Sequence, residues 1–340
     1  LDAIKKTQIK YGGDTMISEE KISTEIIYNR YDIFKKLFEY YMYVSTLMFL
    51  LLIIQIFKDR SKYVNISVKI FKYSILGLFA LHTVGLIARW YISGHAPWSD
   101  AYESMIYVAW ATMAFGVMLG VKSDLTFAST AFVTAMILMI AHWNWMDPSI
   151  GNLQPVLDSY WLMIHVAIIV GSYGPLTLGM VLGVTTLLLM ILTTSKNREK
   201  MALNIKELTI INEMALTVGL VMLTIGNFLG GMWANESWGR YWGWDPKETW
   251  ALISIMIYAF VIHMRLIPGL RSRFGFSVAS VLAFGSIMMT YFGVNFYLAG
   301  LHSYAKDDQE ISITYIATAL ILITVLSVFA YRKHLKYFKK

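Results

Sequence analysis

Long apolar runs recur along the chain, and short polar stretches separate them. The hydrocarbon core of a bilayer is roughly 30 Å thick, so one crossing needs about 20 mostly apolar helical residues. Runs that meet this requirement cover residues 40–57, 68–89, 101–120, 125–142, 160–193, 209–231, 247–264, 275–298 and 312–331. The pattern predicts an all-α, polytopic membrane protein with about nine transmembrane helices.

The fifth run, residues 160–193, is too long for one straight crossing. A helix of this length would extend about 51 Å at about 1.5 Å per residue. We therefore expect it either to protrude into the basic loop that follows or to bend near Gly171, Gly174 and Pro175.

Composition supports a membrane location and excludes several other classes of protein. Of 340 residues, 57% are hydrophobic and only 15% are charged, whereas soluble domains carry about 25% charged residues. This balance excludes an ordinary cytosolic fold and a nucleic-acid-binding arm, so no nucleic acid partner is expected. The sequence contains no cysteine, which excludes disulfides, thiolate metal sites and a cysteine nucleophile.

Lys and Arg are distributed unevenly between the two sets of predicted loops. One set carries basic clusters at 58–72, 196–206, 265–273 and 332–340, whereas the opposite set holds Arg89, Arg240, Lys247 and Lys306. Because short cytoplasmic loops retain positive charge, we expect a cytoplasmic C-terminus and an external N-terminus. The side that carries the basic clusters would then be cytoplasmic, or stromal in a plastid.

Residues 1–39 are predicted to form an external N-terminal segment ahead of a transmembrane domain over residues 40–340. The chain starts at Leu1 rather than at Met, and no signal peptide precedes this segment. We therefore expect residues 1–39 to be a junction to an upstream part of a longer or processed polypeptide, and a trimmed start is the alternative.

Tryptophan is concentrated on the predicted external face. Ten of the 11 Trp residues fall in or beside its loops: Trp90, Trp98, Trp143, Trp145, Trp161, Trp233, Trp238, Trp242, Trp244 and Trp250. A belt that anchors the protein in one leaflet would explain any single one of them. Five lie within residues 231–250, interleaved with glycines and Tyr241, and such a surface would accept a flat ring. Trp238 and Trp242 would stack on one face if this stretch is locally helical.

The end of this aromatic stretch carries a helix-start signal. Asp245 fits the N-cap position, Pro246 the first helical position, and Glu248 the third residue after the cap. We therefore expect the aromatic loop to end beside the mouth of the seventh span.

Two histidines lie at the level of the aromatic loop. His165 is about five residues below the start of the fifth span, and His302 is four residues beyond the eighth. Two imidazoles that approach a planar macrocycle from opposite sides are what six-coordinate haem iron requires. A packed, hydrogen-bonded histidine is the more common reading of either residue alone.

His263 lies near the cytoplasmic end of the seventh span, about 26 Å along a helix from Pro246. An ionisable side chain at that depth is a functional candidate, and a hydrogen bond to a carbonyl or headgroup near Arg265 is the alternative. His95 and His142 are interpreted as exposed residues, and lining a vestibule or contacting a substrate is the alternative.

The rare external cations Arg89, Arg240 and Lys247 are candidates to pair with haem propionates. Salt bridges within the chain, to Glu103, Asp100 or Glu236, are equally compatible with their positions.

The stretch Gly230–Trp250 contains Trp233-Ala234, Trp238-Gly239, Tyr241-Trp242-Gly243-Trp244-Asp245-Pro246-Lys247-Glu248 and Trp250. This pattern resembles the tryptophan-rich "WWD" signature of haem-handling proteins of cytochrome c maturation. Three further segments, 94–104, 159–166 and 300–304, resemble the CcsA (ResC) component of the System II cytochrome c synthase. The resemblance covers roughly residues 68–331 and makes residues 40–340 a transmembrane haem-handling domain with its WWD loop at about 230–250.

This resemblance implies a function in cytochrome c biogenesis. Such a protein moves haem b across the membrane and attaches it, through its vinyl groups, to the Cys-x-x-Cys-His thiols of apocytochrome c on the external side. The implied activity is that of a holocytochrome c synthase of the haem lyase type. Implied partners are a CcsB (ResB)-type subunit or fused domain, apocytochrome c and membrane lipid. The implied location is the bacterial cytoplasmic (inner) membrane, with the active face external or periplasmic, or the thylakoid membrane in a plastid.

The resemblance also implies a set of site residues. His165 and His302 would be catalytic ligands of the haem iron, and His263 would bind haem inside the membrane together with a ligand from the CcsB-type part. The implied haem-binding residues are Trp233, Trp238, Tyr241, Trp242, Gly243, Trp244, Asp245, Pro246, Glu248 and Trp250.

Three other functions compete with this one. A haem exporter or relay would bind haem and pass it on without ligation. A small-solute transporter with an aromatic vestibule would bind no haem, and it would leave the external Trp concentration unexplained. A quinol oxidoreductase would need two haems with complete ligand pairs on this chain, and the unpaired His263 weighs against it.

Overall fold

The computed structural model describes residues 2–12, 17–57, 62–142, 146–151, 159–298, 300–302 and 312–338. Within these ranges all regular elements are helical, and nine candidate membrane spans are long and apolar enough to cross a bilayer. The prediction of an all-α, polytopic membrane protein is therefore confirmed. Trp143, Trp145, Ser303 and Tyr304 lie outside the described residues.

The structure contains twelve α-helices within the described residues. They are α1 (Asp2–Gly12), α2 (Glu19–Tyr31), α3 (Ile33–Phe57), α4 (Lys62–Ser93), α5 (Ala101–Gly120), α6 (Asp124–Ala141), α7 (Tyr160–Ile191), α8 (Arg198–Trp238), α9 (Pro246–His263), α10 (Arg273–Met288), α11 (Val294–Tyr297) and α12 (Ile313–Tyr337), with the short 3-10 helices η3 (Met264–Leu266) and η4 (Pro268–Leu270) and the π-helix η5 (Met289–Gly293).

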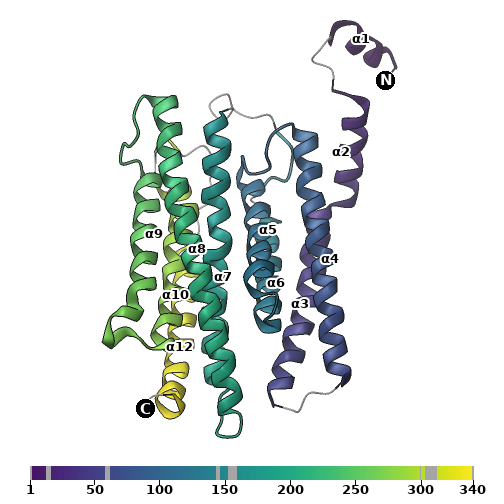
Figure 1. Ribbon diagram of the computed structural model, residues 1–340. Helices are drawn as coiled ribbons and strands as arrows, with labels where there is room; N and C mark the ends of the chain where they lie inside the picture. The colour runs from purple at the N-terminus through teal and green to yellow at the C-terminus, as the bar shows by residue number, and fades with distance from the viewer. Residues whose placement is uncertain are drawn as a thin grey trace.

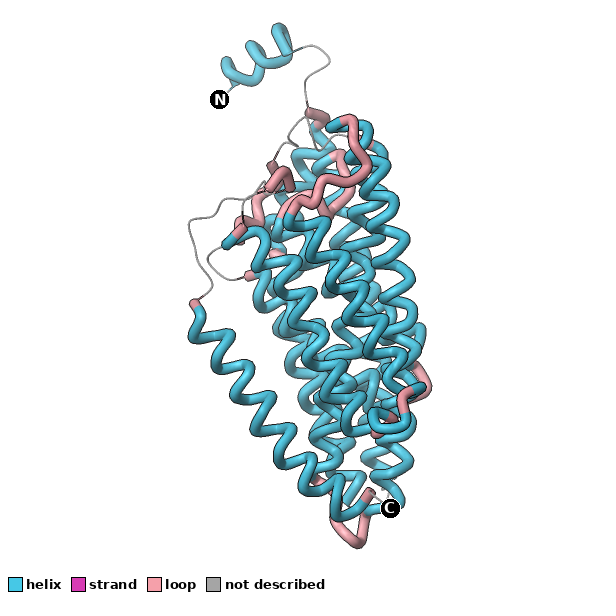
Figure 2. The backbone as a smooth tube through the Cα atoms, turned by 90° about the vertical axis from the view of Figure 1, so that its left-hand side faces the viewer, coloured by secondary structure: helices cyan, strands magenta, loops and turns pink. Residues whose placement is uncertain are grey.

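The long helices form one bundle, with the N-terminus and the C-terminus at opposite ends (Figure 1). The connections predicted to be external, including the one between α8 and α9, gather at the end that carries the N-terminus. Helix α12 packs on α7 and α10 but diverges from the bundle towards its start (Figure 2). Which end faces the cytoplasm stays a prediction from the Lys and Arg distribution.

Several helices run past the predicted spans. Helix α3 begins at Ile33 rather than at residue 40, and α8 covers 41 residues instead of 209–231. A hydropathy criterion ends a span where polar residues begin, but the backbone hydrogen bonds continue beyond the membrane core. Helix α7 stays one helix across Pro175, and its connection to α8 protrudes at the end opposite the N-terminus (Figure 1).

Small residues let α7 pack closely against its neighbours. A Cβ added at Gly174 would lie 2.7 Å from the backbone of Ala111 on α5, and one added at Gly226 would lie 2.6 Å from Ile169 on α7. Such close approach is typical of helix pairs in membranes. Next along α8, Gly230 faces the ring of His165, so the same packing delivers α8 to the candidate site.

Candidate functional site

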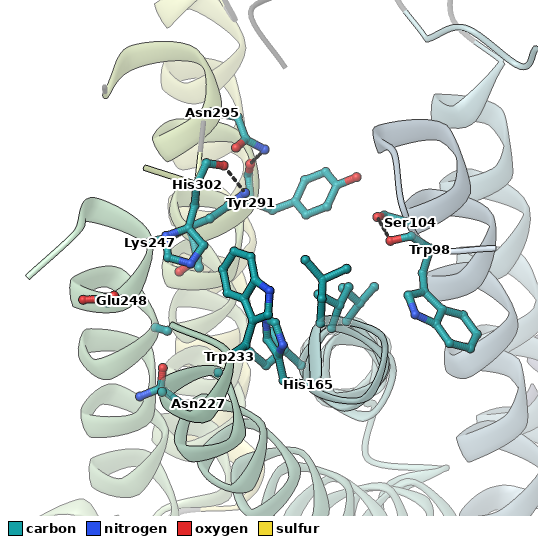
Figure 3. Close-up of a pocket in the computed structure, with 18 of the residues that line it drawn as sticks. Trp98, Ser104, His165, Asn227, Trp233, Lys247, Glu248, Tyr291, Asn295 and His302 are labelled. Atoms are coloured by element: carbon teal, nitrogen blue, oxygen red, sulfur yellow. Dashed lines mark hydrogen bonds between the residues drawn. The ribbon is translucent and has the colours of Figure 1, made fainter. Parts of the chain in front are cut away.

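A cavity of about 230 Å³ lies at the end of the bundle that carries the α8–α9 connection. His165, Trp233 and His302 line one side, and Trp98 and Ser104 line the other (Figure 3). Asp100, four residues before Ser104, also lines the cavity. Further lining residues come from α8, the α8–α9 connection, α9, η5 and α11, namely Asn227, Gly230, Gly231, Tyr241, Trp242, Lys247, Glu248, Ala251, Thr290, Tyr291 and Asn295. The cavity therefore joins helices that are far apart in the sequence, and we call it the cleft.

His165 lies on the first turns of α7 and is 5% exposed. Its Nδ1 lies 2.8 Å from the carbonyl oxygen of Trp161. A carbonyl only accepts, so Nδ1 must carry the proton and donate, which leaves Nε2 with a lone pair. In this tautomer His165 is competent to bind a metal through Nε2.

His302 reaches the same cleft from the segment after α11 and is held by a carboxylate. Its Nδ1 lies 2.9 Å from Oδ2 of Asp245, and the backbone N–H of Leu301 donates to Oδ1 at 2.6 Å. This pairing again places the proton on Nδ1 and leaves Nε2 as the acceptor. A carboxylate behind an imidazole is the arrangement that orients many metal-binding histidines.

Asp245 connects the α8–α9 loop to His302. It caps α9 in a capping box with Glu248, as the sequence predicts. Burial raises the pKa of the Asp245 carboxyl, but the hydrogen bonds from His302, Leu301 and Lys247 outweigh it and lower the pKa to about 2. The carboxylate is therefore ionised at neutral pH and remains a hydrogen-bond acceptor for His302.

Trp233 lies between the two histidines. Its ring centroid is 5.3 Å from that of His165, in a stacked arrangement, and 5.5 Å from that of His302. Trp238 packs edge-on against Trp233 at 4.7 Å and against His302 at 5.1 Å. Trp233 is 1% exposed, and its Nε1 has no hydrogen-bond acceptor among the described residues. The rings of His165, Trp233, Trp238 and His302 therefore form one compact cluster.

The aromatic loop is shorter than the predicted 230–250. Helix α8 continues to Trp238, Gly239 ends it at φ +68°, and α9 begins at Pro246. Trp238 is thus the last residue of α8, and it does not stack on Trp242 as a locally helical stretch would require. Trp242 instead packs edge-on against Trp244 at 5.7 Å.

Glu248 holds the shortened loop together. Its carboxylate accepts hydrogen bonds from the backbone N–H of Gly243 at 2.8 Å and of Asp245 at 3.2 Å. It also pairs with Arg240, whose guanidinium lies over the Trp238 ring. The loop conformation therefore depends on this buried carboxylate as well as on its aromatic residues.

Four of the ten residues predicted from the resemblance to bind haem line the cleft: Trp233, Tyr241, Trp242 and Glu248. The other six, Trp238, Gly243, Trp244, Asp245, Pro246 and Trp250, do not. Of these, Trp238 and Asp245 contact His302, and Trp244 is 70% exposed at φ +57°.

His263 lies at the other end of α9, as predicted, and is exposed. Its Nδ1 bonds the carbonyl of Ala259 at 2.6 Å, one turn earlier. The 18 residues of α9 correspond to about 27 Å of helix, so His263 cannot take part in the cleft.

The three cations predicted to be external were candidates either for haem propionates or for salt bridges within the chain, and the structure separates them. Arg89 is 0% exposed and pairs with Glu103 at 2.8 Å, which confirms the salt-bridge alternative for this residue. Arg240 pairs with Glu248 rather than with Glu236. Lys247 lines the cleft, where its Nζ lies 3.3 Å from the carbonyl of His302.

Interpreting His95 and His142 as exposed residues was wrong. His95 is 8% exposed and bonds Ala96 and Ser99, and His142 bonds the carbonyl of Leu138 at 2.8 Å. Both pack at the ends of helices, where hydropathy alone suggests an open loop.

The opposite wall of the cleft contains residues that the sequence analysis did not predict to belong to the site. Trp98, Asp100 and Ser104 fall within segment 94–104, which resembles CcsA. The resemblance therefore indicated this segment but did not predict that it lines the cleft. Tyr291 lies in the π-helix η5, and its hydroxyl donates to the carbonyl of Ala101 at 3.0 Å. Short π-helical segments often mark functional sites, but no pattern in the sequence signals this one.

Comparison with known proteins identifies the family. The family model described as "Cytochrome C assembly protein" matches residues 98–302, which include both walls of the cleft. The chain belongs to the cytochrome c assembly protein family, and its relatives are of the CcsA type.

Three relatives show how far the similarity extends. Protein NrfI of Wolinella succinogenes is 47% identical over 315 residues, which are 91% of this chain and 34% of that protein, so the chain spans about a third of its length. Cytochrome c biogenesis protein CcsA of Prochlorococcus marinus (strain MIT 9301) is 33% identical over 250 residues, 66% of this chain and 81% of that protein. CcsA of Marchantia polymorpha is 32% identical over 309 residues, 75% and 94% of the two chains.

Proposed function

We propose that the chain moves haem b across the membrane and attaches it covalently to the Cys-x-x-Cys-His thiols of apocytochrome c. It would do so as a holocytochrome c synthase together with a CcsB-type part, fused or separate. The family supports a role in cytochrome c assembly, and the cleft supports the handling of haem within that role.

The observation that carries the proposal is that His165 and His302 have the same tautomer, with the proton on Nδ1. Each bonds an acceptor through Nδ1, so each keeps an Nε2 lone pair at one cavity. Two imidazole nitrogens are the axial ligands of a low-spin haem. The aromatic cluster of Trp233 and Trp238 offers apolar, flat surfaces to a porphyrin.

The haem propionates need cationic partners at the edge of the cleft. Lys247 lines the cavity, and Arg240 is paired with Glu248 of the cavity wall and keeps 30% of its side chain exposed. We assign the propionates to these two residues. Arg89 is excluded because its guanidinium is fully buried and paired with Glu103.

His263 is proposed as an earlier station for haem. It is exposed at the far end of α9, and among the described residues of this chain it has no second histidine beside it. A partner must then supply the other axial ligand, which is the proposed role of the CcsB-type part. Haem would pass from His263 to the cleft.

Attachment requires the haem vinyl groups and the substrate thiols to meet in a fixed geometry. Positioning of reactants can supply about 7–11 kcal/mol of a reaction barrier. The histidine of the incoming Cys-x-x-Cys-His segment would replace His165 or His302 on the iron. This exchange aligns the thiols with the vinyls and weakens retention of the product.

The experiment is a holocytochrome assay in cells that depend on this protein, comparing the wild type with His165→Ala and His302→Ala. His142→Ala is the matched control, because His142 also bonds a carbonyl through Nδ1 but lies outside the cleft. We expect both cleft variants to reach the membrane and to lose covalent haem attachment, while the control retains it. Normal yield in both cleft variants would overturn the proposal. Haem release without attachment in the wild type would favour the relay alternative.

A further inference from the structure

The wall of the cleft that faces the two histidines is backed by a buried cluster of charged groups. Arg89 donates from Nε to Oε1 of Glu103 at 2.8 Å, and its Nη2 lies 3.8 Å from Oδ2 of Asp100. Arg89 also donates to the carbonyl oxygens of Pro148 and Ser149. One guanidinium therefore faces two carboxylates, and Glu103 holds the closer position.

Asp100 is the member of this cluster that reaches the cleft. It caps α5, where its Oδ1 accepts the Glu103 N–H at 2.7 Å. Its side chain is 47% exposed and lines the cavity, whereas Glu103 is 1% exposed. Oδ2 of Asp100 lies beyond hydrogen-bond distance of Arg89, so it can exchange a proton with a group in the cleft.

The surroundings of Asp100 favour proton exchange near neutral pH. Burial and the Glu103 carboxylate raise the pKa of Asp100 to about 6, while the Glu103 N–H, Arg89 and His95 oppose this rise. Tyr102 on α5 and Tyr291 on η5 are the other titratable groups beside it. Lys247 and Glu248 line the same cavity from α9.

Glu248 is the second carboxylate that lines the described part of the cleft, and its oxygens already accept hydrogen bonds within the chain. Glu248 accepts hydrogen bonds from Gly243, Asp245 and Arg240. Asp245, behind His302, is bonded on both oxygens. Asp100 is thus the carboxylate with an oxygen available to a bound molecule.

We propose that Asp100 is the catalytic proton-transfer residue for thioether formation, an inference that rests on the proposed function. Adding a thiol across a vinyl group breaks the S–H bond and the C=C π bond, and it forms one C–S and one C–H bond. The Asp100 carboxylate accepts the thiol proton as sulfur bonds the inner vinyl carbon. It then returns a proton to the terminal carbon, so the carboxylate is regenerated and no oxidant or reductant is consumed.

The test is the pH dependence of attachment by the haem-loaded protein, purified together with its CcsB-type part, with a synthetic peptide that contains one Cys-x-x-Cys-His segment. Asp100→Asn is the main variant, because asparagine also caps helices and preserves the contact with the Glu103 N–H. Asp100→Glu restores the carboxyl group. Asp147→Asn is the matched control, because Asp147 is an exposed carboxylate near the same end that does not line the cleft.

A positioned general base contributes about 10²- to 10⁴-fold to a rate, so we expect Asp100→Asn to slow attachment about 100-fold or more. The wild-type rate should rise with pH through about 6 as Asp100 ionises. In Asp100→Asn that inflection should vanish, leaving the rise towards the thiol pKa of about 8.5. Asp100→Glu should recover part of the rate and the inflection, and Asp147→Asn should match the wild type.

An Asp100→Asn variant with wild-type rate and pH profile would overturn the assignment. So would a variant that has lost the low-spin haem spectrum, because Asp100 would then act on haem binding. A wild-type protein that binds no haem, or binds it and never attaches it, would instead overturn the proposed function, so the two failures are distinguishable.

Discussion

The two ends of helix α9 present histidine in contrasting settings. At the start of α9, Asp245 bonds His302 across 57 positions of sequence, and Trp233 and Trp238 enclose the imidazole. At its end, His263 is exposed, and among the described residues its hydrogen-bond partner is the carbonyl one turn earlier. A histidine fixed by a carboxylate is suited to retain a metal, and an exposed one is suited to exchange it. The contrast is what a relay from a loose station to a tight one requires.

The largest effect is expected from removing the charge behind His302. In Asp245→Asn, the amide can present its NH₂ to Nδ1, which would shift the proton to Nε2 and block that ligand. Loss of such an orienting group typically costs about 10- to 100-fold in metal affinity, and we expect that loss in haem titrations. Glu236→Gln, at an exposed acid on the last turns of α8, is the control. Equal haem affinity in the wild type and Asp245→Asn would remove the distinction between the two ends of α9.

A smaller effect is expected at the exposed end. His263→Ala should lower the haem delivered to the cleft several-fold in membranes and leave the affinity of the cleft for added haem unchanged. Added imidazole should restore delivery by occupying the vacated position. If the variant instead loses affinity in the cleft, the two sites are not separate stations.

Gly300 packs against Asp245, so a substitution there tests the start of α9 separately from its end. A Cβ at this position would meet Oδ1 of Asp245 and would lie 2.9 Å from Cδ of Pro246. Because Asp245 is bonded on both oxygens, it cannot move aside cheaply, and overpacking of this kind costs about 1–3 kcal/mol. Gly300→Ala should therefore weaken haem binding by roughly tenfold, whereas Gly269→Ala, in open space near His263, should not. Identical titrations of the two variants would contradict this view.

The smallest effect is expected in the pH dependence of stability that Asp245 contributes between pH 7 and about 5. Its pKa is lowered to about 2, so its contribution to stability is complete above the unfolded value of about 3.9 and is lost as pH falls through 2. The difference in unfolding free energy between the wild type and Asp245→Asn should stay constant from pH 7 to about 5. Tryptophan fluorescence during denaturation would measure it. A difference that shrinks already between pH 7 and 5 would mean that another group controls the loop.

Local signals in the sequence predicted much of this structure. The apolar runs gave the spans, and Asp245, Pro246 and Glu248 gave the start of α9. His165 and His302 were predicted at one level, and the structure brings both to the cleft. Each of these features depends on residues close together in the chain or on depth along a helix.

Features that depend on packing between distant segments could not be predicted. The Asp245–His302 bond joins two loops, and the wall at Asp100 reaches the cleft because α5 packs against α7 and Tyr291 bonds Ala101. The extension of α8 to Trp238 was missed because polar residues beyond a span can remain helical. Burial of Arg89 follows from its partner Glu103 on another helix.

Absorption spectroscopy tests the central claim, that His165 and His302 hold haem iron in the cleft, most directly. Oxidised and dithionite-reduced spectra would be recorded for the purified protein and for His165→Ala, His302→Ala and the control His142→Ala. We expect a low-spin signal in the wild type and the control, and its loss or conversion to high spin in each cleft variant. An unchanged low-spin signal in both cleft variants, or no haem in the folded wild type, would contradict the account.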